Sequence, residues 1–206
     1  MALEVQNISY KYPQGDSVLE SVSLHVGDSE MLALVGPSGC GKSTLLHCIA
    51  GLIEMDSGEV SLDGKVLNAV QVHKRGIGIM MQDQPLYEHF TVEQNIAFPL
   101  KTRGKKTSLC NELMEQLDLS AIAKRKVSKC SGGERRRIAL ARTVVIRPKV
   151  LLLDEPFISI DPSLRETMME YIQLLHTELN ASTIIVSHHH EEVEQMCNQL
   201  LTMEQL

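Results

Sequence analysis

The chain has 206 residues, of which 43% are apolar, and it carries a formal net charge of −6. This length allows one sizeable core, or one α/β domain with a small attached subdomain. The negative balance excludes a global basic field for nucleic acid, and no apolar run reaches the roughly 18 to 20 residues that span a bilayer. Five cysteines at scattered spacings form neither a disulfide framework nor a zinc pattern. Residues 1–12 lack the charged start and apolar stretch of a secretory signal, so we expect a cytoplasmic protein with reduced thiols.

The first half of the chain alternates between strand and helix patterns. Residues 3–26 show the period-two alternation of short strands. Residues 31–35 form a continuous apolar run, as in a strand buried on both faces, and a helix is expected soon after it. Residues 58–67 predict a hairpin with a two-residue Asp-Gly turn, and residues 77–81 predict another strand.

The second half begins with a mostly helical, basic stretch. Residues 150–153 and 183–186 then predict two further buried strands with an amphipathic helix between them. Strands that alternate with helices imply an α/β fold with a mostly parallel sheet covered by helices. We expect a single domain over residues 1–206, with a core at 1–90 and 148–206 and an inserted helical lobe at about 91–147.

A phosphate-binding pattern lies between the buried strand at 31–35 and the helix that follows. It fits G-x-x-x-x-G-K-[ST]. The glycines let backbone N–H groups converge on one anion, and the helix presents its N-terminus to the same phosphates. Lys42 is expected to reach the β- and γ-phosphates of ATP, and Ser43 to give a hydroxyl to Mg²⁺. The nucleotide-binding residues predicted here are Gly36, Pro37, Ser38, Gly39, Cys40, Gly41, Lys42, Ser43 and Thr44.

Two acids follow the apolar strand at 150–153. Asp154 at the strand end can hold Mg²⁺ through water, and Glu155 can polarise the water that attacks the γ-phosphate. A strand end with two solvated acids is the alternative interpretation of this pair when it is taken alone. Together with the phosphate-binding pattern, the pair indicates ATP hydrolysis.

The segment Ser131-Gly132-Gly133-Glu134 lies shortly before these acids. With it, the chain resembles the nucleotide-binding subunit of ABC transporters over nearly its whole length, and the phosphate loop, this signature segment and the acidic strand follow in the family's order. The resemblance implies an ATPase with a P-loop NTPase core, an antiparallel β-subdomain and an inserted helical lobe.

The resemblance also implies roles for single residues. Gln82 falls on the glutamine that contacts nucleotide and metal, and His188 on the histidine that senses the γ-phosphate. Tyr12 falls on the aromatic residue that stacks on adenine; Tyr10 competes for this role, and we favour Tyr12 because it precedes the Pro13 turn. The expected catalytic residues are Lys42, Glu155 and His188, and the expected metal site consists of Ser43, Gln82 and, through water, Asp154.

The resemblance further implies a head-to-tail homodimer with two ATP molecules between the subunits. Ser131 and the backbone N–H groups of Gly132 and Gly133 would face the γ-phosphate bound by the other chain. The chain would sit on the inner face of the cell membrane and dock on an integral membrane transporter subunit, through residues 82–88 and the lobe up to about Lys106. No nucleic-acid partner is expected.

This sequence departs from the family pattern in several places. Glu134 replaces the usual Gln; it completes a Ser-x-x-Glu capping box and brings a carboxylate near a phosphate. Residues 159–160 make the loop before Asp161 atypical. The helical lobe is several residues shorter than most, and we expect the chain, which ends at Leu206, to lack the usual terminal strand and a regulatory domain.

Three local sequence patterns, and the predicted transport function, each have an alternative interpretation. The histidine run 188–190 suggests a metal site, but consecutive residues do not converge on one ion, so we expect His189 and His190 to be solvated. The arginine run 135–137 suggests a nucleic-acid patch, but solvated or ion-paired side chains are the expectation. Cys40 is expected to be a small filler rather than a redox switch. A DNA-remodelling ABC ATPase would need a coiled coil or zinc module that does not fit in residues 44–130, and an ABC translation factor would need two such domains.

Overall fold

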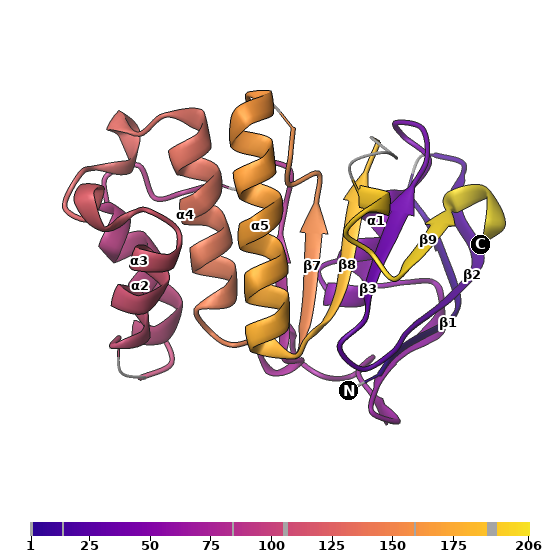
Figure 1. Cartoon of the computed structure of the whole chain (residues 1–206). Helices are drawn as coiled ribbons and strands as arrows, with labels where there is room; N and C mark the ends of the chain where they lie inside the picture. Colours follow the sequence, from indigo (N-terminus) through magenta and orange to yellow (C-terminus); the bar gives the residue numbers. More distant parts are fainter. Residues whose placement is uncertain (1, 14, 84, 105–106, 159, 189–192) are drawn as a thin grey trace.

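The computed structural model describes residues 2–13, 15–83, 85–104, 107–158, 160–188 and 193–206. Their elements form two sheets with helices packed around them (Figure 1). Several of the predictions made above fall outside the described residues. They concern Lys106, His189, His190, residue 84 of the segment 82–88 and residue 159 of the segment 159–160.

The N-terminal strands and the predicted hairpin form an antiparallel sheet. Its strand order is β2-β1-β4-β5. The hairpin turns at Asp63 and Gly64, whose φ angles of 52° and 72° are both positive, as the favoured two-residue hairpin turn requires. The strand bounds are β1 Leu3–Lys11, β2 Ser17–Val26, β4 Ser57–Leu62 and β5 Lys65–Val66.

A second, parallel sheet has the strand order β6-β7-β8-β3-β9. Every residue of β3, β7 and β8 is buried, which explains why their sequences are continuous apolar runs rather than alternating ones. The strand bounds are β3 Met31–Val35, β6 Ile77–Met80, β7 Val150–Asp154, β8 Ser182–Ser187 and β9 Gln199–Thr202.

The parallel sheet separates two layers of apolar packing. Leu32 and Leu34 of β3 pack in a cluster with α1 and the antiparallel sheet, whereas Met31, Ala33 and Val35 pack with α2 to α5 on the other side. The helix bounds are α1 Lys42–Ala50, α2 Val92–Lys101, α3 Leu109–Gln116, α4 Gly132–Val144 and α5 Pro162–Leu179. Short 3₁₀ turns lie at Val72–Lys74, Ser120–Ile122, Val127–Lys129 and Met203–Gln205.

Figure 1 shows α2, α3 and α4 at one end of the molecule and β1 and β2 at the other, with the parallel sheet and α5 between them. The predicted fold class, an α/β fold with an antiparallel β-subdomain and helical insert, is therefore confirmed. The division into a core and a lobe at the predicted residues stays a prediction. Within the described residues, none of the helices has both the length and the apolarity that a membrane-spanning segment needs.

The expectation that the chain lacks a terminal strand is wrong. Strand β9 pairs in parallel with β3, and Asn198 fixes its start by exchanging hydrogen bonds with the backbone of Met31 at 2.8 Å. The strand was missed because it has only four residues, of which two are apolar, and it is partly exposed along its length. Such a short edge strand produces no readable period.

Candidate active site

The loop between β3 and α1 has the backbone that the phosphate-binding pattern predicts. Gly39 and Gly41 have φ angles of 83° and 100°, a left-handed conformation that glycine adopts without a steric penalty. At Gly41 a Cβ atom would also lie 3.0 Å from the carbonyl oxygen of Val18. Helix α1 begins with no side-chain cap and no acid in its first turn, so its N-terminal N–H groups and partial positive charge remain available for an anion.

The Lys42 side chain is held inside this loop. Its residue is only 6% exposed, and its Nζ donates hydrogen bonds of 2.8 Å to the carbonyl oxygens of Gly36 and Pro37. The Cys40 sulfur lies 3.8 Å from the same nitrogen, which agrees with a small side chain packed in the loop. The ammonium group therefore lies within the loop, against two of its carbonyl oxygens.

Ser43 and Asp154 bring two oxygen donors together. The Ser43 hydroxyl donates a hydrogen bond of 3.0 Å to Oδ1 of Asp154. Burial raises the pKa of the Asp154 carboxyl above its ordinary value, and the hydrogen bond from Ser43 acts against this shift. A hydroxyl and a carboxylate are hard oxygen ligands of the kind that Mg²⁺ prefers alongside water and phosphate, so these two residues fit that ion.

Glu155 follows at once in a different conformation. Its φ angle is 49°, a strained left-handed value for a residue other than glycine, and its backbone N–H donates to the carbonyl oxygen of Val186 at 3.0 Å. Its Oε2 lies 2.8 Å from Nδ1 of His188. The turn thus directs the second acid away from the first and toward the residue that follows β8.

The predicted nucleotide contacts on the other elements are placed as follows. Tyr12 is 42% exposed, and its hydroxyl lies 3.2 Å from that of Thr44 at the start of α1. The Tyr10 ring contacts the Tyr12 ring edge-on at 4.9 Å between centroids, and of the two Tyr12 is the more exposed. Gln82 is exposed after β6, and no hydrogen bond joins it to Ser43 or Asp154 within the described residues.

The signature segment caps α4 in its own chain. Ser131 Oγ accepts a hydrogen bond from the Glu134 N–H at 3.2 Å, and Glu134 Oε2 accepts one from the Ser131 N–H at 2.7 Å, which is the predicted capping box. Glu134 Oε1 also pairs with Arg125 at 2.9 Å. These contacts lower the pKa of the Glu134 carboxyl, and the hydrogen bond from the Ser131 backbone has the largest effect. Ser131 and Gly132 remain exposed.

The three arginines after the signature segment have different partners. Arg135 forms an ion pair with Glu88, as expected if the arginine run is solvated or ion-paired. Arg136 and Arg137 donate to backbone carbonyl oxygens, and Arg137 also forms an ion pair with Asp118 at 4.0 Å.

The structure brings most, but not all, of the predicted residues together. Asp154 ends β7, and the phosphate loop, Glu155 and His188 directly follow β3, β7 and β8, which lie side by side in the sheet. This edge is where α/β sheets bind ligands. The signature segment lies at the start of α4, and no described hydrogen bond joins it to these residues. A pocket of about 400 Å³ beside the loop also includes Thr202 and Glu204. Neither residue was predicted, because Thr202 ends β9, which was itself not predicted, and Glu204 lies in the 3₁₀ turn that follows it.

Comparisons with known proteins agree with this geometry. The model of the ABC transporter family matches residues 19–158. The chain is 38% identical to the sulfate/thiosulfate import ATP-binding protein CysA of Synechocystis sp., over 98% of this chain and 58% of that protein. It is 39% identical to the proteins of the same name from Cucumis sativus, over 98% of this chain and 60% of the relative, and from Bradyrhizobium diazoefficiens, over 99% and 61%. The chain thus spans about three-fifths of the length of these relatives. It belongs to the ABC transporter family.

Proposed function

We propose that the chain binds ATP with Mg²⁺ and hydrolyses it to ADP and phosphate, and that this powers solute transport by a separate membrane-spanning subunit. One observation carries the proposal. Three neighbouring strand ends hold a phosphate loop with a buried lysine, a serine–aspartate pair and a glutamate–histidine pair. The names of the relatives, import ATP-binding proteins, support import as the direction of transport.

Each group in this arrangement has a chemical task. Lys42 and the N-terminus of α1 bind the β- and γ-phosphates, and Tyr12 stacks on adenine. Ser43, Asp154 through water, and Gln82 would hold Mg²⁺, which would neutralise charge on the phosphate oxygens. Glu155 accepts a hydrogen bond from the attacking water, whose oxygen bonds to the γ-phosphorus as the bond to the β–γ bridging oxygen breaks.

We propose that the active chain is a head-to-tail homodimer. Ser131 and Gly132 are exposed on the helical lobe, and no described contact joins them to the phosphate loop of their own chain. An N-terminus of a helix carries partial positive charge. In a second chain, this end of α4 would complete the binding of the γ-phosphate.

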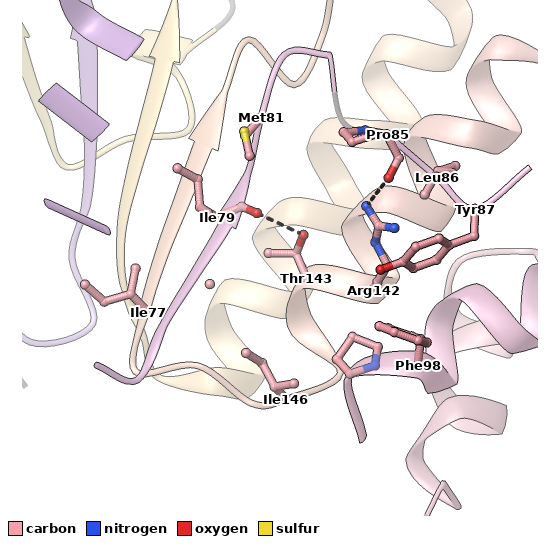
Figure 2. A pocket seen from close by; sticks show the side chains of 12 residues that line it. Ile77, Ile79, Met81, Pro85, Leu86, Tyr87, Phe98, Arg142, Thr143 and Ile146 are labelled. Atoms are coloured by element: carbon pink, nitrogen blue, oxygen red, sulfur yellow. Dashed lines mark hydrogen bonds between the residues drawn. The ribbon is translucent and has the colours of Figure 1, made fainter. Parts of the chain in front are cut away.

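The proposed docking groove for the membrane subunit is an apolar pocket of this chain that includes Pro85, Leu86 and Tyr87. This pocket has a volume of about 410 Å³ and lies between the edge strand β6, α4 and the segment around Tyr87 (Figure 2). Its lining is apolar except for Thr143 and Arg142, and Arg142 lies 5.7 Å from the Tyr87 ring centroid and donates to the Pro85 carbonyl oxygen at 2.8 Å. An apolar helix of the partner that carries an acid matches this chemistry. Docking there would hold the chain at the inner face of the membrane.

The test compares the purified chain with its Lys42→Ala variant. The wild type should bind ATP in the presence of Mg²⁺ and release phosphate, whereas Lys42→Ala should lose both. Lys65→Ala, which removes an exposed lysine from β5, is the matched control and should behave as wild type. Equal ATP affinity and turnover in wild type and Lys42→Ala would contradict the proposal.

A further inference from the structure

Arg136 lies at the junction of three segments of the proposed site. It is in the first turns of α4, after the signature segment. Its NH1 donates a hydrogen bond of 2.8 Å to the carbonyl oxygen of Gln82, and its NH2 donates one of 3.4 Å to that of Ile158. Gln82 opens the segment that leads to the docking groove, and Ile158 lies three residues after Glu155. One guanidinium group therefore joins the helical lobe to both loops of the core.

Within the part of the chain that the structure describes, neither neighbouring arginine donates to the backbone of Gln82 or Ile158. Arg135 pairs with Glu88 and donates to the Val127 carbonyl oxygen. Arg137 donates to the carbonyl oxygen of Leu117 at 3.0 Å and pairs with Asp118 at 4.0 Å. Since the side chains leave successive positions of one helix, their different partners follow from their directions and not from their residue type.

The charge of Arg136 also lies close to the acids of the site. Burial is the main influence on its pKa and lowers it, while the negative charges of Asp83, Asp154 and Glu155 act in the opposite direction. Arginine keeps its charge in such surroundings. Its planar fork can donate to two acceptors that lie apart, which a single ammonium group cannot do with the same geometry.

We propose that Arg136 is a positioning residue for ATP hydrolysis: its two hydrogen bonds hold the backbones of Gln82 and Ile158 to the start of α4. This inference rests on the proposed function. It predicts that the segment beside the docking groove and the loop after Glu155 keep a fixed arrangement through this side chain. A small displacement of catalytic groups costs a large factor in rate, so loss of the bridge should lower turnover without removing the phosphate loop.

The experiment uses the full chain with Arg136→Met, Arg136→Lys and the control Arg137→Met. Amide hydrogen exchange is measured first, without nucleotide. Peptides that contain Gln82 and Ile158 should exchange several-fold faster in both Arg136 variants than in wild type, because Lys keeps the charge but not the fork. Arg137→Met should leave these peptides unchanged. Melting temperatures show that all variants are folded.

Steady-state ATPase kinetics in saturating Mg²⁺ give the second measurement. Both Arg136 variants should lower kcat on the order of tenfold with KM for ATP within about twofold of wild type, and Arg137→Met should change neither. Unchanged exchange and kcat in Arg136→Met, or wild-type values for both in Arg136→Lys, would overturn the proposal. A wild type without Mg²⁺-dependent ATPase would contradict the proposed function, and the exchange comparison would still decide whether Arg136 forms the bridge.

Discussion

His188 Nδ1 lies 2.8 Å from Glu155 Oε2, so the first residue after β8 contacts the first residue after β7. The two strands are neighbours in the parallel sheet, which fixes the distance between their ends. A carboxylate that accepts a hydrogen bond from an imidazole keeps its second oxygen for another donor, such as a water molecule. The positive φ angle of Glu155, 49°, turns its side chain toward this partner and away from Asp154.

The variant Glu155→Gln tests the role of this acid. Gln has the same length and can still accept a hydrogen bond, but it cannot take a proton from water. We expect turnover to fall by roughly 10² to 10⁴, with ATP binding retained and an ATP-bound dimer favoured. Phosphate release and size-exclusion chromatography with Mg²⁺ and ATP measure both effects. The control Glu20→Gln, at an exposed position of β2, should match wild type, and wild-type turnover in Glu155→Gln would refute the assignment.

The variant Asp154→Asn should make the nucleotide-free chain more stable while weakening its binding of Mg²⁺ and ATP. The pKa of the buried Asp154 is raised, so its ionised form is less favourable in the folded chain than in the unfolded chain. At neutral pH its charge therefore lowers the free energy of unfolding. Without nucleotide, Asn should raise the melting temperature by a few degrees, given roughly 2 to 4 °C per kcal/mol at this size.

The same variant should lose the further stabilisation that Mg²⁺ and ATP give to the wild type. The gain without nucleotide should shrink as the pH falls toward about 4, the ordinary Asp pKa, because the wild-type carboxyl is then neutral. Thermal unfolding with and without Mg²⁺ and ATP measures both effects. The exposed acid Asp16 supplies the control Asp16→Asn. A lower melting temperature in Asp154→Asn without nucleotide would show that the carboxylate is stabilising.

The variant Glu134→Gln tests the departure in the signature segment. Gln keeps an acceptor for the Ser131 N–H but loses the ion pair with Arg125, a partly exposed pair worth under about 1 kcal/mol. We expect ATPase activity at or above the wild-type level, because a negative charge near the γ-phosphate is removed. The control Arg125→Gln removes the same ion pair but keeps the carboxylate, so it should lose similar stability and gain no activity. A large loss of ATPase in Glu134→Gln alone would mean that the carboxylate has a positive role.

The pH dependence of this variant has a definite sign. The pKa of Glu134 is lowered from 4.5, so its charge stabilises the folded chain above that pH, and the stabilisation is lost as the pH falls through the lower folded value. The difference in melting temperature between wild type and Glu134→Gln should therefore be largest near neutral pH and narrow below about pH 4.5. A difference that is independent of pH would contradict this interpretation.

The parts of the site that the sequence predicted are those encoded within one short segment. The loop around Lys42 needs glycines at fixed spacings within one short segment, and the capping box at Ser131 needs one acid three residues later. Both patterns are visible in the sequence, and both structures are observed. The buried strands β3 and β7 could be predicted for the same reason, since burial on both faces leaves a continuous apolar run.

The contacts that could not be predicted join segments that are distant in the sequence. Several of them use backbone groups, which no residue type reveals. Arg136 donates to the backbone carbonyl oxygens of Gln82 and Ile158, 54 and 22 residues away, and every residue has such an oxygen. The pairing of Glu134 with Arg125 depends on how the 3₁₀ turns before α4 bend the chain. Strand β9 could not be predicted from the sequence, because a strand of four residues at the sheet edge shows no recognisable alternation of apolar and polar residues.

The last prediction concerns whether each site is shared between two chains. Lys42 lies at the sheet edge and Ser131 at the start of α4 in the lobe, so a shared site would contain the Lys42 of one chain and the Ser131 of the other. Mixed dimers can separate the two arrangements. In the first mixture, one chain carries Lys42→Ala and the other carries Ser131→Arg. In the second mixture, one chain carries both changes and its partner is wild type.

If sites are shared, both changes in the first mixture fall in the same site, and the other site stays whole. In the second mixture each site is then damaged once. Since loss of one donor to developing phosphate charge costs roughly 10² to 10³ in rate, a damaged site should be nearly silent. The first mixture should therefore retain more ATPase than the second, provided that one intact site turns over alone. Homodimers of each single variant are the controls, and both should be inactive. Higher activity in the second mixture would mean that each chain contains a complete site, and the head-to-tail dimer would have to be abandoned.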